Sequence, residues 1–173
     1  MSRAALSMLL TALCAALTSC ASDPRTGYAF APSHEASLGP VAVELFDNQT
    51  FAHGLEVELT RAIAQELTRS TPWAVAPPAK ARTILSGAIT SARLRLLSTA
   101  PTSGLPQEQA VEVAVDFSLR DARTGKVILS RRNFRAAGSF IPVQGVGERI
   151  ETAHAGAVDA LAQDIVAALR WDW

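Results

Sequence analysis

The chain has 173 residues, 49% of them hydrophobic, and its 16 basic residues balance its 16 acidic residues. A chain of this length and apolar content can bury most of its apolar surface in one domain. The balanced charge excludes the strongly basic composition that is typical of nucleic-acid-binding proteins, so we expect no nucleic-acid partner.

The first twenty residues have the features of a bacterial lipoprotein signal. Arg3 supplies a positive charge, and residues 4–17 form an apolar run that is too short to be relied on as a membrane-spanning helix. Residues 17–20, with the sequence LTSC, are typical of a lipobox, in which small residues let the peptidase approach an alkylated cysteine. We therefore expect residues 1–19 to be removed and Cys20 to be lipidated. The alternative is an ordinary secretory signal with an incidental cysteine.

Lipidation at Cys20 would decide where the protein lies. One acyl chain holds a protein at a membrane only marginally, whereas two or more make the attachment effectively permanent. Ala21 follows the cysteine, where an aspartate would resemble an inner-membrane retention signal, so we expect a lipid anchor in the outer membrane. Cys14 leaves with the signal and Cys20 is consumed by lipid, so the mature chain has no cysteine left for a disulfide.

Residues 20–39 are rich in Ser, Pro, Ala and Gly with little hydrophobic periodicity, which indicates a lipidated tether that leads to a single domain at residues 40–173. Alternation in residues 41–46 predicts a first strand, with Val41, Val43 and Leu45 on one face. Residues 48–50 match a glycosylation acceptor, but after a bacterial lipobox we interpret them as a turn that leads into a helix.

That helix is predicted at residues 55–70, and the pair Thr71-Pro72 ends it. A short strand is predicted at residues 73–76, before Pro77-Pro78. The apolar stripe of the helix consists of Leu55, Leu59, Ala62, Ile63 and Leu67.

Three longer strands are predicted at residues 83–97, 110–121 and 126–140. The middle one is the clearest, because apolar residues occupy every second position and mostly polar residues occupy the other face. That other face is therefore wet or in contact with something polar. Residues 121–126 predict a hairpin turn, with Gly125 where a positive φ is expected. Residues 98–109 predict a polar loop, which is either a partner contact or a connector.

A final helix is predicted at residues 147–170, with an apolar stripe that includes His154 as a packed core histidine. Trp171 and Trp173 end the chain, where packing over this helix is the preferred interpretation and anchoring at a membrane or barrel wall is the alternative. The element order is β-α-β-β-β-β-α. It predicts an α+β fold, a two-layer sandwich in which a mostly antiparallel sheet of about 4–5 strands has two helices packed on one face.

Short motifs along the mature chain resemble those of one known family. They are Gly27-Tyr28 and residues 41–50 (VAVELFDNQT), 54–60 (GLEVELT), 104–108 (GLPQE), 115–117 (VDF), 123–126 (RTGK) and 146–149 (VGER). Together they resemble the lipopolysaccharide-assembly lipoproteins, the LptE-like family. The resemblance implies an outer-membrane lipoprotein that plugs a β-barrel translocon, faces the periplasm or the barrel lumen, and helps lipopolysaccharide reach the outer leaflet. Of that family's functional residues, only the lipid-bearing cysteine transfers, onto Cys20.

Residues 80–135 carry ten basic and four acidic residues, so the sheet region is positive while the rest of the mature chain is negative. Arginine suits bidentate contacts with phosphate, and lipid A phosphates would be suitable ligands. The candidate anionic-lipid contacts are Arg93, Arg95, Arg131 and Arg132. The alternative is that these arginines are solvated and form cross-strand ion pairs. Asp116 favours the alternative, because the predicted hairpin register places it opposite Arg131, or opposite Arg132 after a slip of one residue.

No pattern in the chain indicates catalysis. The three histidines, His34, His53 and His154, lack metal-ligand spacing, and no nucleophile elbow, zinc motif or phosphate-binding glycine loop occurs. We therefore expect no enzyme activity, no metal and no cofactor. The favoured function is a binding and assembly subunit for lipopolysaccharide export, with an outer-membrane β-barrel and lipopolysaccharide or another anionic lipid as partners. The alternative is a periplasm-facing lipoprotein that activates a cell-wall synthase or forms part of a secretion pore, because residues 41–50 followed by a helix also resemble the start of those domains.

Overall fold

The computed structural model describes residues 38–102, 104–142 and 150–171. The chain divides into two units, residues 1–33 and residues 34–173, and every described residue belongs to the second unit. The predicted signal peptide, Cys20, nearly all of the tether and Trp173 lie outside the described residues, so what the sequence indicates for them stays a prediction.

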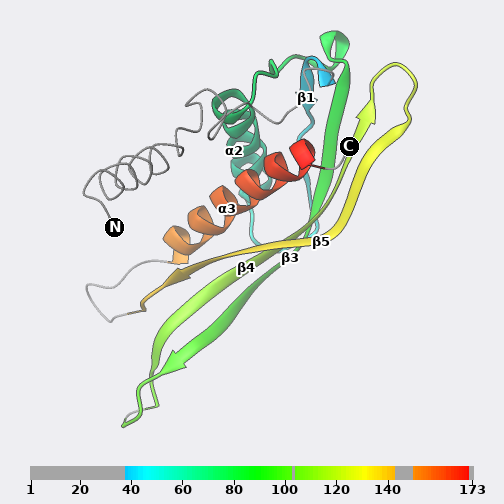
Figure 1. The fold of residues 1–173 in the computed structure, drawn as a ribbon. Helices are drawn as coiled ribbons and strands as arrows, with labels where there is room; N and C mark the ends of the chain where they lie inside the picture. The colour runs from blue at the N-terminus through cyan, green and yellow to red at the C-terminus, as the bar shows by residue number, and fades with distance from the viewer. Residues whose placement is uncertain (1–37, 103, 143–149, 172–173) are drawn as a thin grey trace, which may run out of the picture. The chain divides into compact units, whose positions relative to one another are not determined.

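The described residues form one sheet and two α-helices. In chain order the elements are β1 (Val41–Val43), β2 (Asp47–Asn48), α2 (Leu55–Ser70), the 3-10 turn η2 (Pro78–Lys80), β3 (Thr83–Thr99), β4 (Pro106–Asp121), β5 (Val127–Phe140) and α3 (Ile150–Trp171). The sheet order is β1-β3-β4-β5, and β2 also pairs with β3. β1 and β2 lie parallel to β3, whereas β3, β4 and β5 are antiparallel neighbours. Both helices lie on one face of the sheet (Figure 1), which confirms the predicted α+β fold.

The start of the domain differs from the predicted element order in two places. The expected strand at residues 41–46 ends after Val43 as β1, and a second short strand, β2, follows at Asp47–Asn48, so the side-chain alternation is broken between them. Phe46 is therefore buried, whereas Leu45, which was expected to share a face with Val41, is exposed. The expected strand at residues 73–76 forms only one bridge, Val75 to Val41, because the prolines on both sides have no backbone N–H with which to extend the pairing. The observed order is β-β-α-β-β-β-α.

The helix α2 occupies the predicted residues, because its apolar stripe packs into the core. Gly54 precedes it with a φ of 93°, a conformation that glycine adopts without steric cost. Glu56 and Glu58 lie in the first turn, where their negative charges interact favourably with the positive end of the helix dipole. The buried members of the stripe are Leu55, Leu59, Ile63 and Leu67. No helix of the described residues combines the length and the apolar composition that crossing a membrane requires.

The core lies between the two helices and the inner face of the sheet. Hydrophobic burial drives this packing. The core side chains of the strands occupy every second position, and they pack against helix side chains that remove them from water. The β4 residues of the core are Val111, Val113, Val115, Phe117 and Leu119, and those of α3 include Ala157, Leu161, Ile165 and Leu169.

The strands are much longer than the helices that cover them. The 17 residues of β3 extend for roughly 56 Å at about 3.3 Å per residue, whereas the 22 residues of α3 extend for roughly 33 Å at about 1.5 Å per residue. One end of the β3–β4 hairpin therefore projects past the helices (Figure 1). We call this end, from Leu94 to Gln109, the overhang. It includes all of residues 98–109, which were predicted to form a loop. Both ends of that segment are strand instead, because β3 continues to Thr99 and β4 starts at Pro106.

Candidate functional site

The face of the sheet away from the helices, which we call the open face, is polar as the alternation of β4 predicts. Side chains on β4 that follow each core residue point to this face, and four of them are polar or charged. They are Glu112, Asp116, Ser118 and Arg120. Arg120 at one end is held by Glu44 from the segment after β1, with Nη2 donating to Oε1 at 2.9 Å and to Oε2 at 3.1 Å. The open face is therefore solvent-accessible but organised by ion pairs.

Glu112 is the centre of a charged cluster on this face. Its carboxylate accepts from Nη1 of Arg95 on β3 at 2.8 Å and from Nη1 of Arg135 on β5 at 3.3 Å. Arg93 lies directly opposite Glu112 in the register of β3 and β4, yet within the described residues it forms no ion pair. The ion-pair alternative is therefore correct for Arg95, whereas the charge of Arg93 is left uncompensated by the described part of the chain.

Asp116 does not pair with an arginine in the way that the simple hairpin register predicts. Two irregularities shift the register of β4 and β5: the one between Leu119 and Arg120 places Arg131 opposite Phe117, and a bulge between Val115 and Phe117 places Phe134 opposite Val115. Two residues, Arg132 and Asn133, stand opposite the single Asp116, and Asn133 has a φ of 54°. The Oδ1 atom of Asp116 accepts the backbone N–H of Asn133 at 2.7 Å. The carboxylate therefore fixes the bulge, and the expected side-chain pairing with Arg131 or Arg132 is replaced by this backbone contact.

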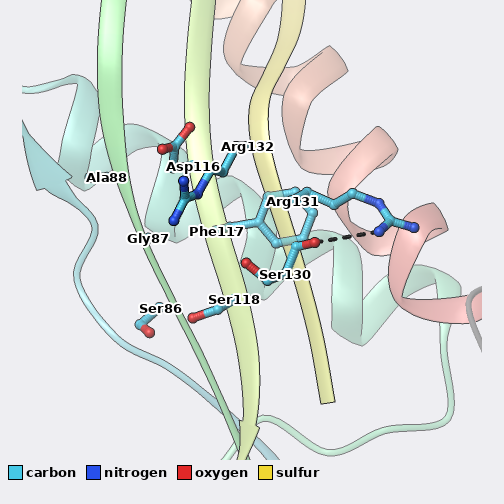
Figure 2. A pocket seen from close by; sticks show the side chains of 9 residues that line it. All are labelled: Ser86, Gly87, Ala88, Asp116, Phe117, Ser118, Ser130, Arg131 and Arg132. Atoms are coloured by element: carbon cyan, nitrogen blue, oxygen red, sulfur yellow. Dashed lines mark hydrogen bonds between the residues drawn. The ribbon is translucent and has the colours of Figure 1, made fainter. Parts of the chain in front are cut away.

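Beside the bulge, the open face is hollowed into a shallow depression of about 420 Å³. Ser86, Ser118 and Ser130 form a row across β3, β4 and β5, because they are register partners in both strand pairs. Figure 2 shows these serines with Asp116 and Arg132 around the depression. Hydroxyl groups in register with a neighbouring guanidinium offer hydrogen-bond donors to oxygen-rich groups such as phosphates or sugars.

The four candidate arginines are not all on the same face. Arg93 and Arg95 share the open face of β3 with Glu112, and Arg132 extends to the depression on the same face (Figure 2). Arg131 is the register partner of the buried Phe117, so it belongs to the helix-side face at the edge strand, where its Nη1 donates to the carbonyl of Ser130 at 3.4 Å. Arg131 and Arg132 are consecutive residues of β5, so they lie on opposite faces of the sheet, as successive residues of a strand do.

The turn before α2 was correctly interpreted as a turn that leads into a helix. The Oδ1 atom of Asn48 accepts from the backbone N–H of Thr50 at 2.9 Å, and its Nδ2 donates to Glu56 at 2.7 Å. The pKa of Glu56 is lowered by a hydrogen bond from its own backbone N–H and then by Asn48. This turn holds Phe51 99% exposed beside residues 90–93 of β3. Sequence reasoning missed Phe51, although an aromatic residue inside a polar turn is a signal that could have found it.

Within the described residues, no group of three or more His, Cys, Asp or Glu side chains is placed to hold a metal ion. His53 is exposed before α2, and His154 is only half-buried on α3, so it is not the packed core histidine that the stripe predicts. His154 follows Ala153, which is fully buried where the backbone of α3 contacts Gly138 of β5, so the His154 side chain lies beside the packed face of the helix. His34 lies outside the described residues.

Comparison with known proteins identifies one family and several similar folds. The lipopolysaccharide-assembly family, LptE, matches residues 38–169. No curated protein matches the chain in sequence. A protein from Xanthomonas campestris is 14% identical with a TM-score of 0.52, covering 80% of this chain and 88% of its own. Uncharacterised lipoprotein B from Nitrosomonas europaea is 17% identical with a TM-score of 0.50, covering 82% and 85%.

A hypothetical protein from Chlamydia trachomatis is also similar, with 13% identity and a TM-score of 0.50, covering 76% of this chain and 95% of its own. At these identities the solved structures share the fold, and the likeness extends to nothing finer. The match over residues 38–169 includes every strand and nearly all of α3, so it spans both the open face and the overhang.

Proposed function

Because the chain belongs to the lipopolysaccharide-assembly family, LptE, we propose that it is a non-catalytic lipoprotein of the outer membrane that helps to place lipopolysaccharide there. The observation that carries this proposal is the family match over residues 38–169, which covers the complete helix-and-sheet domain. Lipidation at Cys20 anchors the domain, and the domain acts by binding and occupancy. In this role it fills or supports an outer-membrane β-barrel while its open face meets the phosphates of the lipid.

The charge distribution supports contact with an anionic lipid. A guanidinium group binds phosphate with two parallel hydrogen bonds, and it does so best when no carboxylate competes for it. Glu112 holds Arg95 and Arg135, so these two arginines are already compensated. Arg93 and Arg132 form no ion pair within the described residues, and both are exposed. Of the four candidate arginines, these two are therefore the ones best able to bind a lipid phosphate.

Recovery of the partner tests the assembly role. The tagged lipoprotein is extracted from membranes with a mild detergent, and the proteins that remain bound are identified. A large integral β-barrel supports the proposal. Recovery of peptidoglycan synthases or of self-assembled rings contradicts it and favours a cell-wall or secretion role.

Serine substitution tests the arginine contacts. Arg93→Ser with Arg132→Ser should weaken retention on immobilised lipid A by at least about tenfold, because a hydrogen bond to a charged group contributes about 1.5–3 kcal/mol. Arg95→Ser is the matched control on the same strand, and it should change retention much less because its partner is Glu112. Arg131→Ser reports the helix-side face. Unchanged retention in the Arg93 and Arg132 variant contradicts the proposed contact.

A further inference from the structure

The overhang exposes an unusual amount of apolar surface for a part of the chain that projects into solvent. Four leucines on it are more than half exposed: Leu94 at 53%, Leu96 at 56%, Leu97 at 53% and Leu105 at 64%. The only charged residues of the overhang are Arg95 and Glu108, and Arg93 directly precedes it. A leucine that stays in water forgoes the stabilisation that its burial would contribute. Four together on one projection form a surface that is adapted to an apolar partner.

The arrangement of these side chains is amphipathic across the ribbon. Leu94 is the register partner of Val111, so it lies on the helix-side face, and Leu96 lies there too, opposite Gln109. Arg93 and Arg95 alternate with them and lie on the open face. Each of these arginines is therefore adjacent in sequence to an exposed leucine. This pairing matches the boundary of a bilayer, where headgroup phosphates lie next to acyl chains.

The tip of the overhang is closed by its own hydrogen bonds. The backbone N–H of Ala100 donates to the carbonyl of Leu105 at 2.8 Å, and the N–H of Gly104 donates to the carbonyl of Ala100 at 2.9 Å. Gly104 has a φ of 67°, which permits this tight reversal. Backbone groups that are already paired lower the free-energy cost of entering an apolar medium.

We propose that the overhang inserts its leucines into the surface of an anionic phospholipid bilayer, with Arg93, directly before the overhang, at the level of the phosphates. The inference rests on the proposed lipid anchor at Cys20. Residues 21–37 can span at most about 60 Å when extended, at about 3.5 Å per residue, which is close to the length of β3. The overhang projects from the domain. A protein partner would need a pocket that matches its shape, whereas a fluid bilayer can surround it without one.

Tryptophan quenching tests the insertion. The mature lipidated chain carrying Leu97→Trp is reconstituted into phosphatidylethanolamine and phosphatidylglycerol vesicles whose acyl chains are brominated, without lipopolysaccharide. The chain has three tryptophans of its own, so the emission of the added one is taken as the difference from the parent chain. We expect this difference emission to lie at shorter wavelength and to be mostly quenched by bromine. Val127→Trp is the matched control, because Val127 is 55% exposed at the opposite end of β4 and β5, and we expect its emission to be unaffected.

Each outcome decides the proposal. Equal quenching of the two tryptophans overturns it, and so does a shift to shorter wavelength without quenching, which indicates contact with protein or with a second copy. Replacing phosphatidylglycerol with phosphatidylcholine should reduce the quenching of Leu97→Trp. Unchanged quenching overturns the proposed contact between arginine and the anionic lipid phosphates. The vesicles contain no lipopolysaccharide and no barrel, so this result is separate from the lipid A retention assay and from partner recovery. Mass spectrometry of the same sample reports the state of Cys20 separately.

Discussion

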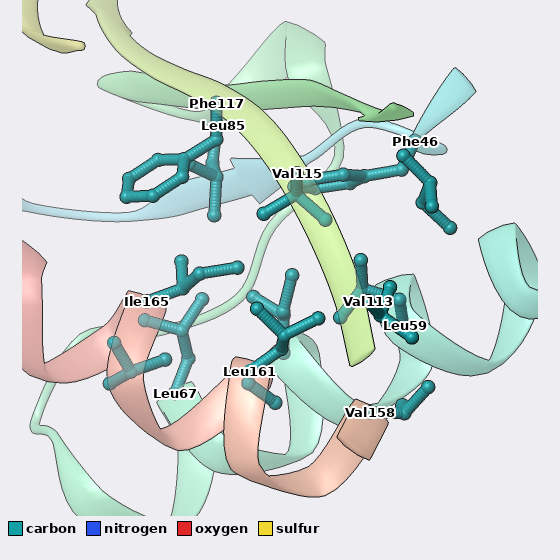
Figure 3. Packing of buried hydrophobic residues seen from close by; sticks show 14 of the residues in the cluster. Phe46, Leu59, Leu67, Leu85, Val113, Val115, Phe117, Val158, Leu161 and Ile165 are labelled. Carbon is teal, nitrogen blue, oxygen red and sulfur yellow. The ribbon is translucent and has the colours of Figure 1, made fainter. Parts of the chain in front are cut away.

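The hairpin of β3 and β4 has two halves with opposite surroundings, and a register shift between Ile89 and Ser91 of β3 separates them. In the covered half, Leu85 on β3 and Val115 and Phe117 on β4 are buried under the helices (Figure 3). Ile89 on β3 is buried in the same core. In the overhang, Leu94 and Leu96 lie on the same face of the same strand and are more than half exposed. Alternation therefore decides which face a side chain takes, whereas the extent of the helix layer decides whether that face is dry.

The position of the helix layer is set by a close contact between α3 and β5. A Cβ atom added to Gly138 would overlap the carbonyl oxygen of Ala153 and lie 2.8 Å from the backbone nitrogen of Ala157. The missing side chain at Gly138 thus lets the helix backbone rest directly on the strand. Because this contact is in the first two turns of α3, it fixes the point at which cover ends and the overhang begins.

The largest expected difference between the two halves is in the cost of removing a leucine. Leu85→Ala in the covered half should lower the free energy of unfolding by about 3 kcal/mol, through lost burial and a residual cavity. Leu96→Ala in the overhang should change it by no more than about 0.5 kcal/mol, because the side chain is already in water. Urea unfolding of the two variants measures both. Similar losses would mean that the overhang is packed in solution.

A single methyl group tests the contact that sets the boundary. Gly138→Ala should lower the free energy of unfolding by about 1–3 kcal/mol, because the new Cβ has to displace helix backbone. Gly156→Ala is the control on the other side of the same contact, where a Cβ would lie 3.6 Å from the Cα of Gly138, an ordinary distance. That variant should be neutral or up to about 1 kcal/mol more stable, since alanine favours a helix. Destabilisation of both by the same amount contradicts the asymmetry.

Local patterns were sufficient to predict most of the fold. Residues 55–70 were recognised from their stripe, and the ends of β4 and β5 at the Asp121 turn agree with the prediction within one residue. The overhang could not be predicted, because residues 98–109 are polar enough to resemble a loop and the pairing that extends β3 and β4 is not local. The split of the first strand likewise depends on where β3 offers a free edge, and this is not encoded in the alternation of residues 41–46.

The sequence was sufficient to single out the four candidate arginines, but not to predict which of them share a face and which are free of an ion pair. The face of Arg131 relative to Asp116 depends on the register shift between Leu119 and Arg120, which places Arg131 opposite the buried Phe117. Their availability depends on Glu112, which selects Arg95 over its closer register partner Arg93. Both effects arise from side-chain packing between three strands, so a pattern read along one strand does not contain them.

Glu112 lies at the border between the covered half and the overhang. Removing its charge tests how far it holds the arginines on either side. Glu112→Gln should lower the free energy of unfolding by no more than about 1 kcal/mol, because ion pairs with exposed arginines contribute about 0–1 kcal/mol. The same change frees Arg95 and Arg135, so retention on lipid A should increase and should become more sensitive to salt. Reduced retention, with the fold intact by circular dichroism, would contradict the assignment of the open face as the anion-binding face.

The smallest effect is expected at the turn that closes the covered end of β4. The Oδ1 atom of Asp121 accepts from the backbone N–H and the hydroxyl of Thr124, at 2.7 and 2.8 Å, and then from the N–H of Arg123. These bonds, that from the Thr124 N–H above all, lower the pKa of Asp121 below its ordinary value of about 3.8. The unfolded chain therefore takes up the proton first as the pH falls.

The stabilisation from Asp121 is complete above the ordinary pKa and is lost as the pH falls through the lower pKa of the folded state. Asp121→Asn keeps the acceptor oxygen but cannot titrate, so its free energy of unfolding should depend less on pH in the acidic range than that of the parent chain. Urea unfolding at several acidic pH values measures the difference. The tip of the overhang has only backbone hydrogen bonds at Ala100 and Gly104 and no carboxylate among its described residues, so it gives no such dependence. Parallel pH profiles for the parent and Asp121→Asn would show that the aspartate contributes to the turn only as a hydrogen-bond acceptor and that its charge has no part in holding the covered end.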